Sequence, residues 1–249
     1  MRILAIVQYD GTNFVGWQIQ PNGRSVQEEI EKVLSMILNT PTKIHGSGRT
    51  DAGVHALAQT FHFDTTKEDI DLGRLRYSLN SLLPLDIHII SLEVVDDSFH
   101  ARYDVASKTY LYSLSMGEYD VFARRYSTQL PRDLDVEAIK KAANKFIGTH
   151  DFKNFTSKET DKNNYVRTIF EFSVDQIEST IVFRITGSGF MKYMVRMIVG
   201  TLIEVGLHKL NEEDIDCLLD SKIRSISPYK APPEGLFLLN VTYERGEKA

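Results

Sequence analysis

Two periodic patterns alternate along the chain, and each half contains both of them. Alternating apolar residues predict strands, and apolar residues at helical spacing after a capping residue predict helices. Strands are predicted at residues 2–9, 43–47, 57–63, 87–95, 108–115, 165–177, 180–186 and 236–243. Helices are predicted at residues 25–38, 71–82, 135–146, 190–205 and 211–219. Helices set among several strands in each half indicate an α+β protein.

The repetition of this theme predicts two similar subdomains with a boundary near residues 103–108. Residues 1–105 form the predicted N-terminal subdomain and residues 106–249 the C-terminal one. Because no low-complexity linker separates the halves, we expect them to share one continuous sheet or a broad interface.

The net charge argues at first against a nucleic-acid partner. The 249 residues include 29 Lys and Arg against 34 Asp and Glu, a net charge of −5, whereas proteins that bind nucleic acids usually carry a basic surface. The charge is uneven, because residues 98–196 hold 15 basic and 12 acidic residues. Any anionic partner is therefore expected to bind locally, at this middle stretch and in a salt-sensitive way.

Composition excludes other classes of protein. A hydrophobic content of 42% is too high for a disordered chain, and the single cysteine, Cys217, cannot form an internal disulfide. On an amphipathic stretch, Cys217 is expected to be a small buried side chain. No export signal and no span of ~20 apolar residues is recognisable, so a cytoplasmic protein is expected.

The densest polar segment is the glycine-rich run at residues 46–56. Its glycines permit tight backbone turns, and it presents Arg49 and Asp51 from adjoining strand ends. A carboxylate beside an arginine stays ionised, which suits a nucleophile or a general base. For the loop alone, a stabilising turn in which Asp51 caps amides and pairs with Arg49 is an equally good interpretation.

His55 follows Asp51 by four residues, a spacing that would suit two metal ligands on a helix. No third ligand is near, and the other histidines do not cluster with Cys or carboxylates at ligand spacing. We therefore predict a hydrogen-bonded structural histidine and no metal site.

The strand at residues 108–115 places Lys108, Tyr110 and Tyr112 on one face. Basic and aromatic side chains together suit an unstacked base and its phosphate. For the strand by itself, half-buried core tyrosines are the favoured interpretation, because strands select tyrosine anyway.

The helix at residues 190–205 is apolar nearly all round, so Arg196 is predicted to be buried. A buried cation requires a partner, and Asp51 is a candidate far away in the sequence. The alternatives are an ion pair with another acid and an arginine that extends to the surface.

These segments together resemble the bacterial tRNA pseudouridine synthase A family, in the family's order from residue 9 to residue 243. The most specific match is the run Arg49–His55, which lies within the matching segment Gly48–Ala56. The others are Tyr9–Gln18, Leu79–Asn80, Leu83–Pro84, Asp86–Ile87, Phe99–Arg102, Lys108–Tyr110, Gly148–Phe152, Met194–Gly200, Ala231–Pro232 and Gly235–Leu236. No catalytic position departs from the family's pattern.

The resemblance implies a fold of two RNA-recognition-like α/β subdomains with a merged, mainly antiparallel central sheet and a cleft between them. It implies an isomerase without a cofactor, which detaches uracil from its ribose at N1 and rejoins it through C5. The implied substrate is the tRNA anticodon stem-loop, at positions 38, 39 and 40, bound by a homodimer.

The resemblance also assigns roles to single residues. Asp51 is implied as the catalytic carboxylate, Arg196 as the basic partner that keeps it ionised, and Tyr110 as the aromatic against the target base. Arg49 is implied to fill the space that the flipped nucleotide leaves. The remaining implied substrate-binding residues are Thr50, His55, Arg102 and Lys108.

Two alternatives to the isomerase stay open. The first is a non-catalytic RNA-binding or chaperone paralogue of the same fold, which has no need of a carboxylate facing a polyanion. The second is a small-molecule hydrolase that uses Asp51, for which no second carboxylate stands at a convincing spacing.

Overall fold

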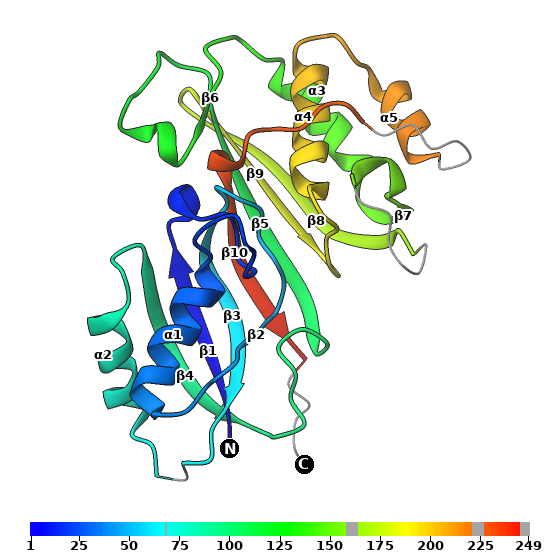
Figure 1. Ribbon diagram of the computed structural model, residues 1–249. Coiled ribbons are helices and arrows are strands. Elements are labelled where there is room, and N and C mark those ends of the chain that lie inside the picture. Colours follow the sequence, from blue (N-terminus) through cyan, green and yellow to red (C-terminus); the bar gives the residue numbers. More distant parts are fainter. Residues whose placement is uncertain (68, 158–163, 221–226, 245–249) are drawn as a thin grey trace. The chain divides into compact units, whose positions relative to one another are not determined.

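A computed structural model describes residues 1–67, 69–157, 164–220 and 227–244 (Figure 1). The predicted α+β class and the mainly antiparallel strand pairing are confirmed. The chain divides into two compact units: unit 1 comprises Met1–Ala106 with Phe237–Ala249, and unit 2 comprises Ser107–Leu236.

Unit 1 contains a sheet with the strand order β4–β1–β3–β10, and β2 pairs with the C-terminal part of β3. All neighbours are antiparallel except β3 and β10, which are parallel. Its strands are β1 (Arg2–Tyr9), β2 (His45–Gly46), β3 (His55–Asp64), β4 (Ile87–Val95) and β10 (Leu236–Tyr243), and its helices are α1 (Val26–Leu38) and α2 (Leu72–Leu82).

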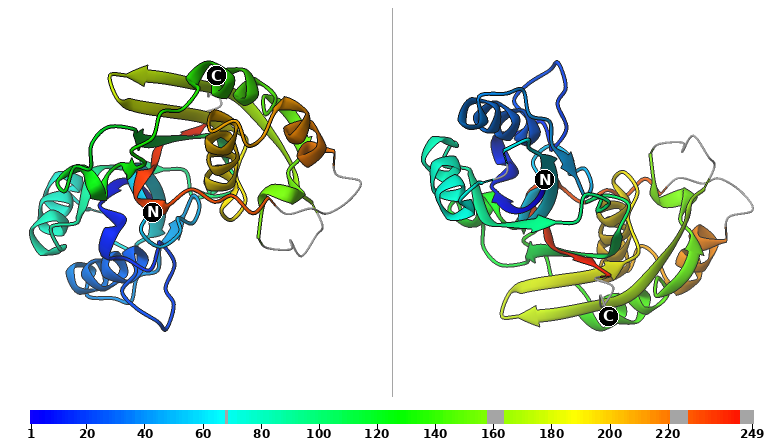
Figure 2. Two further views of the ribbon diagram at one scale, coloured as in Figure 1. Left: turned by 90° about the horizontal axis from the view of Figure 1, so that it is seen from above. Right: turned by 90° about the horizontal axis from the view of Figure 1, so that it is seen from below.

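The core of unit 1 lies between one face of this sheet and the two helices, which pack side by side (Figures 1 and 2). Ile3, Ala5 and Val7 alternate along β1 and are fully buried, because successive side chains of a strand point to opposite faces. The predicted helix start is confirmed, since the Ser25 hydroxyl accepts a hydrogen bond from the Glu28 amide at 3.3 Å.

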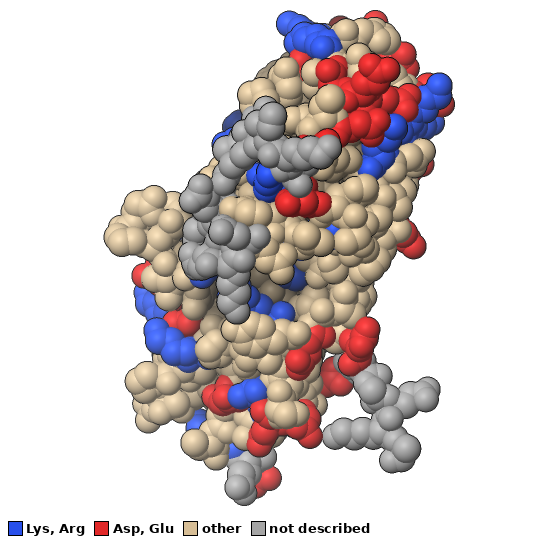
Figure 3. All heavy atoms as spheres, turned by 90° about the vertical axis from the view of Figure 1, so that its right-hand side faces the viewer, with Lys and Arg blue, Asp and Glu red and all other residues tan. Residues whose placement is uncertain are grey.

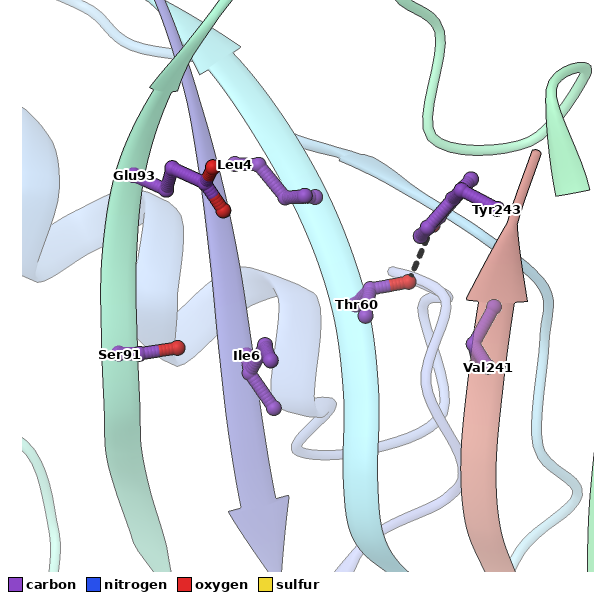
Figure 4. Close-up of a pocket in the computed structure, with 7 residues that line it drawn as sticks. All are labelled: Leu4, Ile6, Thr60, Ser91, Glu93, Val241 and Tyr243. Carbon is purple, nitrogen blue, oxygen red and sulfur yellow. Dashed lines mark hydrogen bonds between the residues drawn. The ribbon is translucent and has the colours of Figure 1, made fainter. Parts of the chain in front are cut away.

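The other face of the same sheet holds a pocket of 160 Å³ (Figure 4). Its lining is mixed, and Glu93 on β4 contributes a carboxylate. The lining residues are Leu4, Ile6, Thr60, Ser91, Glu93, Val241 and Tyr243.

Unit 2 is a second sheet, with the strand order β5–β9–β8–β7 and a short β6 parallel to β5. Helices α3 and α4 pack together on it, as Figure 1 shows. Its strands are β5 (Val105–Ser115), β6 (Thr128–Gln129), β7 (Gly148–Asp151), β8 (Val166–Ile177) and β9 (Thr180–Gly187), and its helices are α3 (Val136–Asn144), α4 (Met194–Gly206) and α5 (Glu212–Leu219).

Three features differ from the sequence prediction. Helix α4 begins at Met194 and not at residue 190, because Tyr193 adopts φ 64°, in the left-handed region. Strand β10 is predicted to belong to the C-terminal subdomain of residues 106–249, but the strand pairs with β3 of unit 1. Because the two strands are far apart in the sequence, the residues around β10 carry no pattern that indicates this parallel pairing. Cys217 is exposed, because Ile215, two residues earlier on α5, takes the buried side of the helix.

Among the residues that the structure describes, no helix combines the length and the apolar character needed to cross a membrane.

Gly200 in α4 allows the backbone of residues 229–231 to approach the helix closely. A Cβ at this position would lie 2.8 Å from the Tyr229 carbonyl carbon and 2.9 Å from the Lys230 nitrogen. Helix propensity favours Ala over Gly by about 1 kcal/mol, but a clash with backbone atoms is not relieved by rotation of a side chain. We therefore expect Gly200→Ala to lower the free energy of unfolding, measured with urea, by about 1–3 kcal/mol.

Gly189→Ala is the matched control, because no atom beyond the two neighbouring residues lies within 4 Å of the added methyl group. It is expected to change the free energy of unfolding by less than about 0.5 kcal/mol. Equal stability of the two variants would contradict the close approach at Gly200.

Candidate functional site

Asp51 lies in a loop that is paired with a second loop of unit 1, Gly11–Trp17. Asp51 and Gly16 form an antiparallel bridge, the Trp17 amide donates to the Thr50 carbonyl at 3.2 Å, and the Gly53 amide donates to the Phe14 carbonyl at 3.3 Å. Two segments that the sequence presents as separate motifs thus form one backbone structure. Its pairing fixes the position of Asp51 from both sides.

Glycines make this close pairing of the two loops possible. Gly16 adopts φ 116°, and a Cβ there would lie 2.7 Å from the Thr50 carbonyl oxygen. A Cβ at Gly11 would lie 2.0 Å from the Val54 carbonyl oxygen. Real Cβ atoms do not approach carbonyl oxygens so closely, so both positions require glycine.

The side chains around Asp51 alternate in exposure. Thr50 is buried, and its hydroxyl is hydrogen-bonded to the Tyr9 hydroxyl at 2.9 Å. Arg49 is exposed and Asp51 is half-buried. Thr50 therefore anchors the loop from inside, and its two neighbours are the residues that solvent can reach.

His55 supports this loop from within unit 1. The residue is 1% exposed, Nδ1 accepts from the Gly11 amide at 3.1 Å, and the ring stacks on Phe237 with centroids 4.6 Å apart. The geometry is that of the hydrogen-bonded structural histidine predicted from the sequence. Any effect of His55 on a ligand must pass through the loop that it holds.

Tyr110 and Tyr112 are buried on β5, and Lys108 is half-buried beside them. The Tyr110 ring meets Phe190 edge-on, with centroids 5.2 Å apart. The Tyr112 hydroxyl is hydrogen-bonded to Thr128 at 2.6 Å and donates to the Pro232 carbonyl at 3.0 Å, and burial raises its pKa. Tyr112 is thus a structural tyrosine, and Tyr110 is the tyrosine that follows Lys108 directly on this face of β5.

Arg196 is 7% exposed, which confirms its predicted burial. Its Nε donates to the Ala231 carbonyl at 2.7 Å, and its own carbonyl accepts from the Ala231 amide at 2.9 Å. These bonds hold the segment before β10 against α4, and the bond from the Tyr112 hydroxyl to Pro232 holds it against β5.

Two basic residues near Arg196 are not among the site residues predicted from the sequence. The Nζ atoms of Lys192 and Lys230 lie 4.8 Å and 4.4 Å from the centre of the Tyr193 ring, and the Arg196 guanidinium carbon lies 5.3 Å from it. Lys192 could have been found from its place four residues before Arg196 in the sequence. Lys230 is far away in the sequence, and only the bonds at Ala231 bring it close.

The predicted site residues therefore fall into groups within each unit. In unit 1, one loop carries Arg49, Thr50, Asp51 and His55, and Arg102 stands exposed on a separate turn. In unit 2, Lys108 and Tyr110 lie on β5, and Arg196 lies on α4.

The pocket of unit 1 is not lined by any of these residues. Among the described residues, no three His, Cys, Asp or Glu side chains are placed to hold a metal ion. On the face drawn in Figure 3, basic side chains are interspersed with acidic ones and do not form one broad basic surface.

Comparison with known proteins agrees with these motifs. The profile of a family described as tRNA pseudouridine synthase matches residues 5–104 and 142–244. A chain of a solved Cbf5-Nop10-Gar1 complex covers 80% of this chain at 14% identity, with a TM-score of 0.34, too low to bear on the fold.

Close relatives cover almost the whole sequence. A protein of Exiguobacterium named tRNA pseudouridine synthase A is 46% identical, and the match covers 98% of each chain. Proteins of the same name from Staphylococcus aureus and Staphylococcus carnosus are 42% and 44% identical, over 99% and 96% of this chain and 92% and 89% of theirs. The profile and the relatives together show that the chain belongs to the tRNA pseudouridine synthase family.

Proposed function

We propose that this protein isomerises uridine to pseudouridine in the anticodon stem-loop of tRNA. In this reaction the bond between N1 of uracil and C1′ of ribose breaks, and the freed base turns. A bond then forms between C5 and C1′, C5 loses its proton, and N1 ends protonated. No atom is gained or lost, so the protein has to supply positioned charge and proton transfer.

The observation that carries the proposal is the fixed carboxylate of Asp51. Its loop is paired to the Gly11–Trp17 loop, and the contact at Gly16 is too close for any other residue. This pairing holds the backbone of Asp51 in place. A half-buried carboxylate held in this way suits attack on C1′ or removal of the C2′ proton. Both routes use Asp51 in its ionised form.

Other residues are assigned by their chemistry. Tyr110 offers a ring against the target base and a hydroxyl that can accept the C5 proton. Arg196 is assigned as the buried cation that keeps Asp51 ionised. Arg49 is assigned to the space that the flipped nucleotide leaves, and Thr50 to anchoring the loop that carries Arg49. Lys192 and Lys230 place two further positive charges around the Tyr193 ring, beside Arg196, and suit backbone phosphates.

His55 is assigned to positioning the loop, and Arg102 and Lys108 to contact with RNA. We further propose a cytoplasmic homodimer in which the net-positive stretches of two subunits line one tRNA-binding cleft. Light scattering of the purified protein, alone and with tRNA, tests the dimer. The overall negative charge then predicts binding that is local and weakened by salt.

Asp51→Asn should abolish pseudouridine formation on an unmodified tRNA transcript while tRNA binding persists. The amide keeps the size of the side chain but can neither attack C1′ nor accept a proton, so we expect kcat to fall by at least ~1,000-fold. Pseudouridine is quantified after digestion of the tRNA, and binding is measured by filter retention.

The matched control is Asp133→Asn, which makes the same change of charge at an exposed position. It should keep both binding and kcat. Normal turnover by Asp51→Asn would exclude the proposed chemistry, and wild-type protein that binds tRNA without forming pseudouridine would favour the chaperone paralogue.

Tyr110→Phe tests the hydroxyl separately from the ring. The Phe ring can keep the edge contact with Phe190, so tRNA affinity is expected to stay within about twofold of wild type. Loss of the proton acceptor should lower kcat by ~100-fold, and Tyr119→Phe, at an exposed tyrosine, is the control. A normal kcat would show that the hydroxyl takes no part in proton transfer.

A further inference from the structure

A tight turn in unit 1, Phe99–Asp104, brings Arg102 and Tyr103 to the surface. The Arg102 guanidinium lies 5.9 Å from the centre of the exposed Tyr103 ring. The amides of Tyr103 and Asp104 both donate to the His100 carbonyl at 3.1 Å. Ala101, which directly precedes the exposed arginine, is fully buried.

Both backbone polar groups of Ala101 are bound by side chains of the sheet. The Ala101 amide donates to Nδ1 of His62 on β3 at 3.1 Å, and its carbonyl accepts from the Tyr243 hydroxyl on β10 at 2.9 Å. The Tyr243 hydroxyl is also bonded to Thr60 on β3, as Figure 4 shows. We call the two bonds to Ala101 the Ala101 clamp.

Neighbouring bonds fix the rest of the turn. Arg2 on β1 donates to the Phe99 carbonyl at 2.7 Å, and the Arg102 amide donates to Nδ1 of His100 at 3.1 Å. Three strands of the sheet thus hold the turn through its backbone. The side chains of Arg102 and Tyr103 stay available at the surface.

The clamp requires a neutral His62. Nδ1 can accept from the Ala101 amide only if it carries no proton, so the ring proton sits on Nε2. Burial lowers the pKa of His62 to about 4, and the nearby charges of Arg2, His100 and His45 lower it as well, while Asp64 alone raises it. At neutral pH the acceptor is therefore present.

We propose that His62 and Tyr243 are positioning residues that orient Arg102 toward a phosphate of the RNA. An arginine that contacts phosphate sets the register of the nucleic acid, and this needs a fixed backbone beneath it. The clamp holds the residue directly before Arg102. The identity of the ligand rests on the proposed function, whereas the clamp is a property of the free protein.

Two substitutions of His62 separate the hydrogen bond from the shape of the ring. His62→Leu removes the acceptor and leaves a buried Ala101 amide, whereas the amide oxygen of His62→Asn can take the place of Nδ1. We expect His62→Leu to raise KM for tRNA roughly tenfold with kcat unchanged, and His62→Asn to restore most of the affinity.

His45→Asn is the matched control, since His45 is exposed and stacks on His62 with centroids 4.9 Å apart. It should leave KM and kcat unchanged. A His62→Leu protein with wild-type KM would overturn the proposal.

A double-mutant cycle distinguishes positioning from general destabilisation. Arg102→Ala should raise KM to a similar extent, and adding His62→Leu to it should raise KM no further, because the group being positioned is gone. An equal additional rise in both backgrounds, or no rise with Arg102→Ala alone, would overturn the proposal.

Hydrogen exchange tests the clamp in the free protein, without RNA. The Ala101 amide should exchange at least about tenfold faster in His62→Leu than in wild type or His45→Asn. Unchanged exchange would exclude the clamp. If wild-type protein formed no pseudouridine, the proposed function would fail, and this measurement would still decide the clamp.

Measurement of amide protection as a function of pH gives a second test, which does not need the His62→Leu variant. The unfolded chain binds the His62 proton near pH 6.5 and the folded chain only near 4, so the stability due to neutral His62 is full above pH 6.5 and decreases as the pH falls toward 4. Protection of the Ala101 amide should fall over this window in wild type but not in His62→Asn, measured at the same pH values. Identical profiles would contradict the clamp.

Discussion

The contact between the Gly11–Trp17 loop and the Asp51 loop is the constraint on which the candidate site depends. The two backbones pair so closely that a single methyl group at Gly16 would lie 2.7 Å from the Thr50 carbonyl oxygen. A catalytic carboxylate must be held to within a fraction of an ångström, and loops rarely achieve this alone. Here paired backbone and the buried Tyr9–Thr50 bond provide that rigidity.

Hydrogen bonds to the backbone also hold two other predicted site residues in place. Arg196 is fixed by a reciprocal pair of bonds with Ala231, and Arg102 follows a residue whose amide and carbonyl are both bound by the sheet. In each case a side chain that we propose to be functional stands on backbone that buried hydrogen bonds hold. Charge is thereby placed at points and not spread over a surface, which fits a protein that carries a net charge of −5 and acts on a polyanion.

Local patterns predicted most elements because they depend on neighbours in sequence. The starts of α1, α2 and α3 follow from the caps Ser25, Asp71 and Asp135, and β4 and β10 have the predicted bounds. The features that differ from the sequence prediction depend on contacts between distant residues or on the conformation of a single residue. The left-handed Tyr193 delays α4, and β10 pairs across the chain with β3. The roles that we propose for Lys230 and His62 also required the fold, because each depends on a residue far away in the sequence.

The release of tritium from tRNA that carries C5-tritiated uridine tests the central claim most directly, because C5 loses its hydrogen only when the new carbon–carbon bond forms. Purified protein should release about one tritium per pseudouridine formed, and the Asp51→Asn variant should release none while still binding the tRNA. Release by the variant at the wild-type rate, or bound tRNA with no release by the wild-type protein, would contradict the account.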